Sequence, residues 1–222
     1  MVSFDPILKR ALKRTGGEEN LEAQLPAPKT ASELALTSDD RYLSLMSLRV
    51  FRAGLRHAVV DARWPAFEEA FHGFLPGRVT LMSDEEMEAC MSNKSLIRHW
   101  AKISAVRDNA AAMQKTAQEH GSFGRWLAAW PGDDTVGLWD TLSKRFNQLG
   151  GNSGPYFLRM AGKDTFILTD DVVRGLTDHG IVDKRPTAKG ERQKVQQAFN
   201  RWAEEAGRPL CQISRILAIS VG

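Results

Sequence analysis

The sequence has few cysteines and no long hydrophobic run. Its two cysteines, Cys90 and Cys211, show neither the spacing of a metal site nor a disulfide framework. No apolar stretch approaches the roughly 20 residues that a membrane-spanning helix needs. The first residues, Met-Val-Ser-Phe-Asp-Pro, lack the charged-then-apolar pattern of a signal peptide. We therefore expect a cytoplasmic protein with no membrane partner, no bound metal and no cofactor.

Strand signals are nearly absent as well. Only Thr165–Leu168 resembles a strand, and it is too short to build a sheet. Elsewhere apolar residues recur at the spacing of helices, which predicts an all-α protein. The helices of the second half are expected at about 95–118, 122–130, 137–149, 155–162, 170–178, 189–206 and 209–219.

Local signals predict several helix ends in the first half. Gly16-Gly17 should end a first helix, and residues 17–37 are typical of a linker or a wrapping arm. Ser38 or Asp39 could cap a second helix that closes near Gly54. Pro65 fits the first turn of a further helix, and the stretch from Ser83 to Glu86 has the pattern of a capping box. The expected organisation is a helix and linker over residues 1–37, packed on a helical domain over 38–222.

The charge balance is mildly basic, with a formal net charge of +3. This allows a polyanionic partner without requiring one. Most basic pairs are typical of a solvated helix face. Lys144 and Arg145 stand closest to a glycine-rich turn, so they are the better candidates for contact with a nucleic-acid backbone.

That turn reads Gly150-Gly151-Asn152-Ser153-Gly154 between two expected helices, which together form a hairpin at about 139–162. Glycines leave backbone N–H groups accessible, and a helix N-terminus behind them favours a phosphate. The turn therefore predicts contact with a DNA backbone through Gly150, Gly151, Ser153 and Gly154. An ordinary helix C-cap at Gly150-Gly151 is the alternative.

A pair of carboxylates, Asp170 and Asp171, follows the hairpin and precedes an apolar helix. An ionised carboxylate can stabilise the positive charge that builds on a sugar when its glycosidic bond breaks. The simpler interpretation is that these aspartates cap the helix. The two roles can coexist.

Two parts of the sequence resemble known families. Arg52-Ala53-Gly54-Leu55, then Trp64 through Phe71, then Leu96 through Ile103 with Asn109-Ala110, resembles the 3-methyladenine DNA glycosylase I family over roughly residues 38–130. The glycine turn with its aspartates resembles the wider helix-hairpin-helix glycosylase superfamily. These resemblances imply an all-α, two-lobed fold that binds double-stranded DNA containing a damaged base.

The resemblance also implies roles for single residues. Asp171 matches the catalytic Asp of the broader alkylation glycosylases, whereas the endonuclease III pattern shifts the match toward Thr169 or Asp170. Phe51, His57 and Tyr156 are placed to receive a flipped base, although Phe51 could instead belong to the core and His57 could be packed or solvated. The lysine of bifunctional members corresponds to Pro155, which has no amine, so no covalent lyase step is expected.

Three departures from the glycosylase I family stand out. Arg49 occupies the place of a Glu that contacts the alkylated base, and His57 the place of a stacking Trp. The family's Cys/His zinc clip is absent, since Cys211 has no histidines near it in the sequence. The resemblance thus carries neither the 3-methyladenine specificity nor the zinc. The function predicted is a monomeric, monofunctional DNA glycosylase that flips and excises a damaged, alkylated base; the alternative is a non-catalytic DNA-binding protein.

Overall fold

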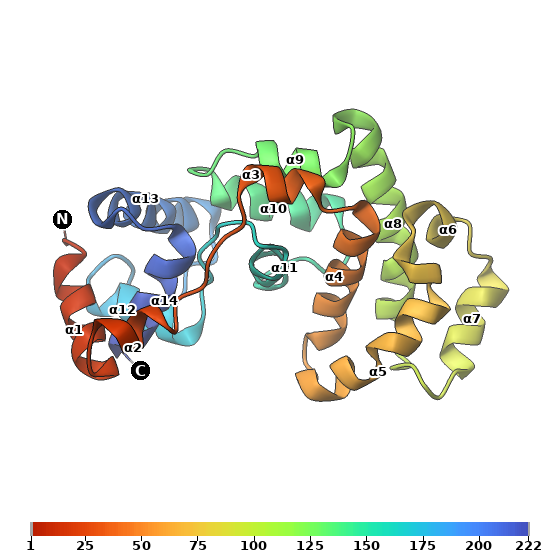
Figure 1. Cartoon of the computed structure of the whole chain (residues 1–222), viewed down its shortest axis with the longest axis horizontal. Helices are drawn as coiled ribbons and strands as arrows, with labels where there is room; N and C mark the ends of the chain where they lie inside the picture. Colours follow the sequence, from red (N-terminus) through yellow and green to blue (C-terminus); the bar gives the residue numbers. More distant parts are fainter. Residues whose placement is uncertain (1, 222) are drawn as a thin grey trace. The chain divides into compact units, whose positions relative to one another are not determined.

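The computed structural model describes residues 2–221, and every regular element among them is a helix (Figure 1). The expectation of an all-α protein is confirmed. The helices are α1 (Asp5–Thr15), α2 (Glu18–Glu22), α3 (Ala31–Leu36), α4 (Asp39–Arg52), α5 (His57–Ala70), the 3₁₀ turn η1 (His72–Phe74), α6 (Pro76–Thr80), α7 (Asp84–Ser92), α8 (Trp100–His120), α9 (Phe123–Ala129), α10 (Thr135–Arg145), α11 (Ser153–Ala161), α12 (Asp170–Asp178), α13 (Lys189–Ala206) and α14 (Leu210–Val221).

The chain folds into two compact units, each with its own core. Unit 1 is built from three separate segments, residues 2–29, 131–138 and 164–221, and unit 2 from residues 30–130 and 139–163. This division differs from the expected boundary at residue 37, because α3 packs on α9 and so groups with unit 2. The helix α10 is shared, with its first residues in unit 1 and the rest in unit 2.

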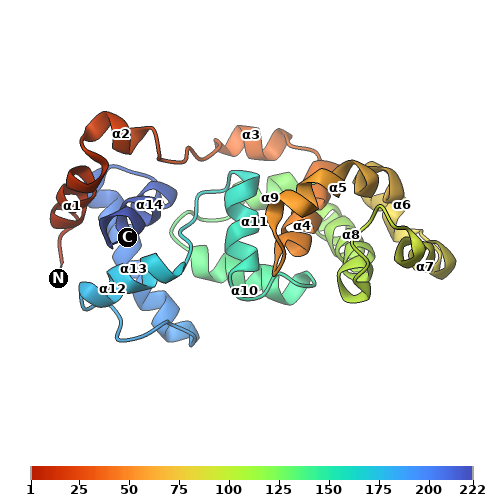
Figure 2. The ribbon, with the colours of Figure 1, turned by 90° about the horizontal axis from the view of Figure 1, so that it is seen from below.

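In unit 1 the two ends of the described chain meet. The first helix, α1, packs against the last, α14, and α12 and α13 also pack on α14 (Figures 1 and 2). The rings of Phe166 and Phe199 stack with centroids 4.3 Å apart. Trp202 is fully buried, and its indole N–H donates to the carbonyl of Val2 at 3.0 Å. Hydrophobic burial of such large side chains is the main source of this unit's stability.

In unit 2 the core is rich in phenylalanine. Phe51 of α4 contacts Phe67 of α5 at a centroid distance of 4.5 Å, and Trp64 stacks on Phe67 at 5.0 Å. Helices α4 and α6 pack on α8, and α11 packs on α4. The contact between α11 and α4 positions the candidate site, because it brings the second helix of the hairpin against the helix that carries Arg49.

Several predicted helix ends are confirmed and one is wrong. Gly16 ends α1 with a φ of +81°, and Ser83 with Glu86 forms the expected capping box of α7. Pro65, expected in the first turn of a helix, lies inside α5. Proline there removes a backbone hydrogen bond and costs about 3 kcal/mol. The helix continues because Trp64 and Phe67, on either side of Pro65, are held in the aromatic core.

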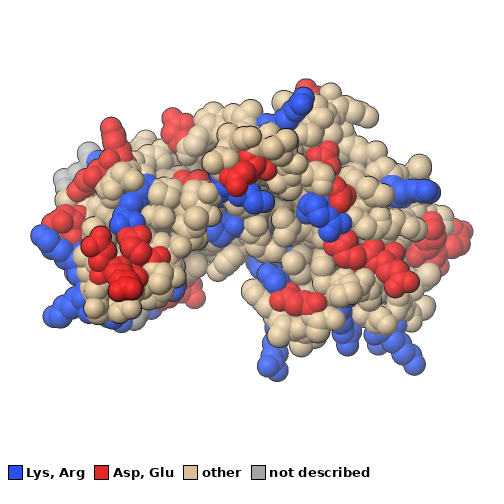
Figure 3. Space-filling model, in the orientation of Figure 1, with Lys and Arg blue, Asp and Glu red and all other residues tan. Residues whose placement is uncertain are grey.

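None of the helices within residues 2–221 is long and apolar enough to cross a lipid bilayer. On the face shown in Figure 3, Lys and Arg side chains are interspersed with Asp and Glu. Basic side chains project from unit 2 near the place where α4 ends and α5 begins (Figure 3). That end of α4 also carries the candidate pocket.

Candidate functional site

The glycine-rich turn connects α10 to α11 and forms the predicted hairpin (Figure 2). The amide of Ser153 donates to the carbonyl of Gly150 at 3.1 Å, and the amide of Gly154 donates to that of Leu149 at 3.1 Å. These two amides therefore serve the turn itself. Gly150 and Gly151 are exposed, and within residues 2–221 their amides have no acceptor.

The glycines of the turn are needed for two different reasons. Gly151 has a φ of +58°, a conformation that residues with a side chain rarely adopt. Gly154 is buried, and a Cβ atom there would lie 3.0 Å from the carbonyl oxygen of Leu149. Gly154 was predicted to contact a phosphate, but it is buried and its amide already donates to Leu149. Gly150 and Gly151 have exposed amides that can contact a ligand.

An asparagine on α8 holds the hairpin in place. Asn109 is buried, its Oδ1 accepts the amide of Asn147 at 2.6 Å, and its Nδ2 donates to the carbonyl of Asn147 at 3.1 Å. The side chain of Asn147 donates to Asp108 at 2.7 Å. The sequence offered Asn109 only as part of a family pattern, and its anchoring role depends on contacts between segments 38 residues apart.

The two basic residues at the end of α10 differ. Arg145 pairs with Glu119 at 2.8 Å, so part of its charge is compensated. Lys144 is exposed and has no ion pair within residues 2–221. Of the two, Lys144 has the more available charge for a phosphate.

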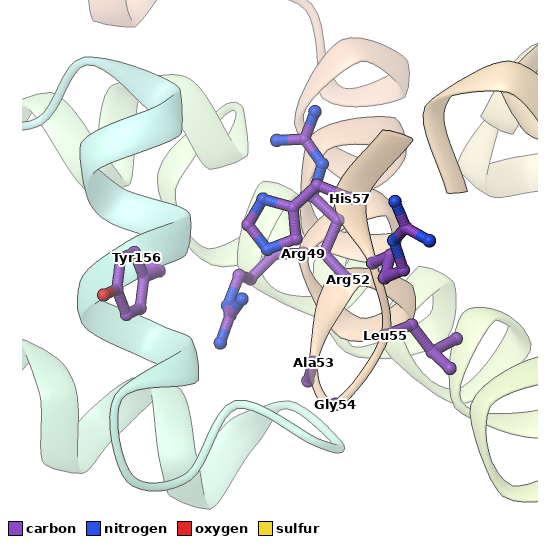
Figure 4. Close-up of a pocket in the computed structure, with 8 residues that line it drawn as sticks. Arg49, Arg52, Ala53, Gly54, Leu55, His57 and Tyr156 are labelled. Atoms are coloured by element: carbon purple, nitrogen blue, oxygen red, sulfur yellow. The ribbon is translucent and has the colours of Figure 1, made fainter. Parts of the chain in front are cut away.

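A hollow of about 470 Å³ opens in unit 2 where α4 ends and α5 begins, with α11 opposite (Figure 4). Its volume lies within the range of small-ligand sites. Three of the predicted pocket residues line it, namely Arg49, His57 and Tyr156. The remaining lining residues are Arg52, Ala53, Gly54, Leu55 and Arg56.

The Arg49 side chain on α4 extends toward the Tyr156 ring on α11 (Figure 4). The guanidinium carbon of Arg49 lies 4.6 Å from the centre of the Tyr156 ring, a cation–π contact. The Nε atom of Arg49 is buried and has no hydrogen-bond partner within residues 2–221. Burial, and to a lesser extent the charge of Arg52, lowers the pKa of Arg49, but an arginine remains protonated at any physiological pH.

A buried lysine supports the wall of the hollow. Lys102 of α8 donates from Nζ to the carbonyl of Ala53 at 2.6 Å and to that of Phe51 at 3.3 Å. These carbonyls lie at the C-terminal end of α4, where a cation is favoured. Burial and the charge of Arg49 lower the pKa of Lys102. The sequence showed Lys102 only as part of the family pattern.

Phe51 does not line the hollow. Its side chain is fully buried between Trp64 and Phe67, as its place on an apolar helix face also allowed. The pocket prediction for Phe51 therefore fails on geometry, because its position on α4 directs the ring into the aromatic core. His57 lines the hollow as the exposed first residue of α5.

The carboxylate pair lies on the first turn of α12, in unit 1. Thr169 caps this helix, since its hydroxyl accepts the amide of Val172 at 3.2 Å, so the aspartates are not the cap. Asp171 pairs with Arg174 and has a side chain that is 47% exposed. Asp170 pairs with Arg185, and its side chain is 97% exposed. The partly shielded Asp171 has the environment better suited to an electrostatic role.

Among residues 2–221, no group of three His, Cys, Asp or Glu side chains is arranged to hold a metal ion. Both cysteines are buried, Cys90 in unit 2 and Cys211 in unit 1.

The glycine turn of the hairpin and the hollow lined by Arg49, His57 and Tyr156 lie in the same unit. Comparisons with known proteins identify the family. The family model described as methyladenine glycosylase matches residues 34–145, half of the 222-residue chain. The chain belongs to the methyladenine glycosylase family.

Two relatives carry related names. The DNA-3-methyladenine glycosylase of Haemophilus influenzae is 37% identical over 75 residues, which cover 32% of this chain and 40% of that protein. DNA-3-methyladenine glycosylase 1 of Escherichia coli is 29% identical over 82 residues, or 37% of this chain and 44% of that protein. The matched region thus spans less than half the length of either relative.

Solved structures share the fold. A variant of 3-methyladenine DNA glycosylase I in complex with 3-methyladenine superposes with a TM-score of 0.54 at 22% identity, covering 68% of this chain and 89% of that one. The 8-oxoguanine DNA glycosylase of Methanocaldococcus jannaschii reaches a TM-score of 0.59 at 12% identity, covering 95% of this chain and 91% of that one. The predicted helix-hairpin-helix glycosylase fold is confirmed.

Proposed function

We propose that this protein is a monofunctional DNA glycosylase that removes a damaged base from double-stranded DNA by hydrolysing its bond to deoxyribose. The match of the methyladenine glycosylase family to residues 34–145 is the observation that carries the proposal. The relatives are named for 3-methyladenine, which is an alkylated base. This chain would likewise act on a damaged base. It would work as a monomer in the cytoplasm.

The DNA backbone would be held by the hairpin. The exposed amides of Gly150 and Gly151 can donate to a phosphate, and Lys144 in the last turn of α10 offers an uncompensated charge. The Ser153 side chain lies at the first residue of α11 and adds a hydroxyl at the helix N-terminus. Such contacts position the duplex without reading its sequence.

The base would leave the stack and enter the hollow lined by Arg49, His57 and Tyr156. Flipping a base costs a few kcal/mol, and less for a damaged pair. As the glycosidic bond breaks, positive charge builds on the sugar. We assign the carboxylate that stabilises this charge and orients the attacking water to Asp171, with Asp170 as the alternative.

No covalent step is included in this mechanism. A lyase would need an amine just past the hairpin turn, and the corresponding residue, Pro155, is buried and has none. Lys163, at the other end of α11, directs its Nζ to the carbonyl of Trp130 at 2.8 Å. The product would therefore be an intact abasic site.

The test is to incubate the protein with duplexes that carry single alkylated, deaminated or oxidised bases and to cleave the products with alkali. Asp171→Asn keeps the size of the side chain and should lower the excision rate by a factor of about 100 to 1,000 with duplex affinity unchanged. Asp170→Asn is the matched control and should change the rate less than tenfold. Absence of excision on every lesion, with DNA binding intact, would refute the enzymatic proposal.

A non-catalytic DNA-binding protein is the second candidate. It is favoured by Arg49 and His57, which stand where the resembled family has a Glu and a Trp. Such a protein would bind abasic and intact duplexes through the hairpin, would excise no base, and would keep its duplex affinity in Asp171→Asn. The excision assay therefore separates the two candidates directly.

A further inference from the structure

The hollow in unit 2 has an unusual charge balance. Three arginines and one histidine line it, and none of its lining residues is acidic. Arg52 is compensated, because it makes a two-point pair with Asp61 at 2.8 Å. Arg49 and Arg56 have no carboxylate partner within residues 2–221. The hollow therefore presents a net positive charge to whatever enters it.

On the side of the hollow formed by Tyr156, a bound ligand would contact Arg49. Its guanidinium lies over the Tyr156 ring, which fixes it as a flat surface. A guanidinium plane stacks well on a nucleobase, and its N–H groups donate hydrogen bonds but accept none. A base that binds here must therefore offer acceptors, such as a carbonyl oxygen or an unsubstituted ring nitrogen.

A positively charged base fits this hollow poorly. A purine methylated on a ring nitrogen carries a positive charge while it is attached to deoxyribose. At an effective dielectric constant of about 20, two unit charges roughly 5 to 6 Å apart repel by an amount equivalent to about 100-fold in binding. A glutamate in place of Arg49 would instead attract such a base by a similar factor.

We propose that the hollow selects an uncharged damaged base that presents hydrogen-bond acceptors to Arg49, and that it discriminates against cationic N-alkylated purines. This inference rests on the proposed glycosylase function and concerns its substrate class. A DNA phosphate shares the acceptor chemistry. The guanidinium plane of Arg49 and the volume of about 470 Å³ favour the base, because a planar base can stack on that plane and a tetrahedral phosphate cannot.

The experiment measures excision rates, above spontaneous base loss, on duplexes identical except for one lesion. The uncharged set is hypoxanthine, uracil and 8-oxoguanine, each with a carbonyl oxygen. The cationic set is 3-methyladenine and 7-methylguanine. The wild-type protein should excise at least one uncharged lesion ten or more times faster than either cationic lesion.

Variants of Arg49 test the cause of that preference. Arg49→Glu should slow the uncharged lesion and speed the cationic ones, changing their ratio by about 100-fold or more. Arg49→Gln removes the charge and keeps a donor, so it should weaken the preference without reversing it. Arg78→Glu makes the same charge change at an exposed residue of α6 that does not line the hollow, so it should alter the ratio less than tenfold. Unfolding temperatures within a few degrees of the wild type show that each variant folds.

The outcomes are distinct. Equal or faster excision of the cationic lesions by the wild type overturns the inference and leaves the glycosylase function standing. A uniform slowing of all lesions by Arg49→Glu, with weaker binding of undamaged duplex, assigns Arg49 to a phosphate and also overturns it. No excision of any lesion removes the glycosylase function, and the inference with it.

Discussion

The buried Asn109 makes a sharp test of how the hairpin is held. Replacing it by alanine removes both hydrogen bonds that join α8 to the backbone of Asn147. A net hydrogen bond contributes about 1 kcal/mol, and a partly buried group left without a partner costs about 1–3 kcal/mol. We therefore expect Asn109→Ala to destabilise the protein by about 2–4 kcal/mol. For a chain of this size, the midpoint of thermal unfolding should fall by about 2–4 °C for each kcal/mol.

The effect should also be local. Backbone amides of residues 146–152 should exchange their hydrogens faster in Asn109→Ala, because Asn147 loses the acceptor of its amide. Affinity for duplex DNA should fall with them, since the exposed amides of Gly150 and Gly151 no longer have a fixed direction. Hydrogen exchange followed by mass spectrometry and a duplex-binding titration measure these two consequences separately.

Asn147→Ala is the matched control. It removes the bond between the Asn147 side chain and Asp108 but keeps both backbone contacts with Asn109. Because Asp108 and Asn147 are solvent-accessible, the loss should be below about 1 kcal/mol. A destabilisation by Asn109→Ala no larger than that of Asn147→Ala would refute the anchoring role.

Three further predictions concern backbone geometry and titration. Gly124→Ala places a Cβ atom 2.6 Å from the carbonyl oxygen of Leu34, so it should destabilise unit 2 by several kcal/mol in a chemical unfolding experiment. Gly151→Ala meets no atom within 4 Å, so its cost should be only about 1 kcal/mol from the positive φ, and a larger loss of stability would show a contact missing from the structure. Burial, followed by the charge of Arg10, lowers the pKa of His179 below its usual 6.5 in the folded protein. Just below that pH the unfolded chain therefore binds more protons than the folded protein does. Stability should therefore decrease as the pH falls below about 6.5, and His179→Gln should flatten that part of a plot of unfolding temperature against pH.

Much of the helical framework could be predicted from local sequence. The helices α12 and α13 begin and end at the predicted residues, because their periodicity is strong and their ends carry clear signals. Pro65 shows the opposite case. The preference of proline for the first turn of a helix describes an isolated helix. The helix α5 instead continues through Pro65 because aromatic packing holds it on both sides of the proline.

The candidate site was only partly predictable. Arg49 and His57 were candidates from their places in the family pattern, and Tyr156 from its position after the glycine turn. All three line one hollow, although Tyr156 lies about a hundred residues beyond the others in the sequence. For Phe51 the sequence left both the pocket and the core open, and the structure places its ring in the aromatic core. The cap of α12 was misassigned: the pattern suggested the aspartates, but Thr169 holds that position.

The roles of Asn109 and Lys102 were beyond local reasoning. Each acts on the backbone of a segment far away in sequence, so no spacing signal marks it. The resemblance implied a two-lobed fold, but it did not show which segments form each unit, because unit 1 collects three segments that local patterns treat as unrelated. Long-range contacts of this kind must come from a structure.

The pairing of α1 with α14 bears on how the chain folds during synthesis. Residues 30–163 contain both segments of unit 2, so this unit can assemble while the ribosome is still translating the rest. The first helix, α1, cannot complete its packing at that stage, because α14, against which it packs, is translated about two hundred residues later. Until then the apolar face of α1 that packs on α14 stays exposed, so we expect chaperones to bind this helix in the nascent chain.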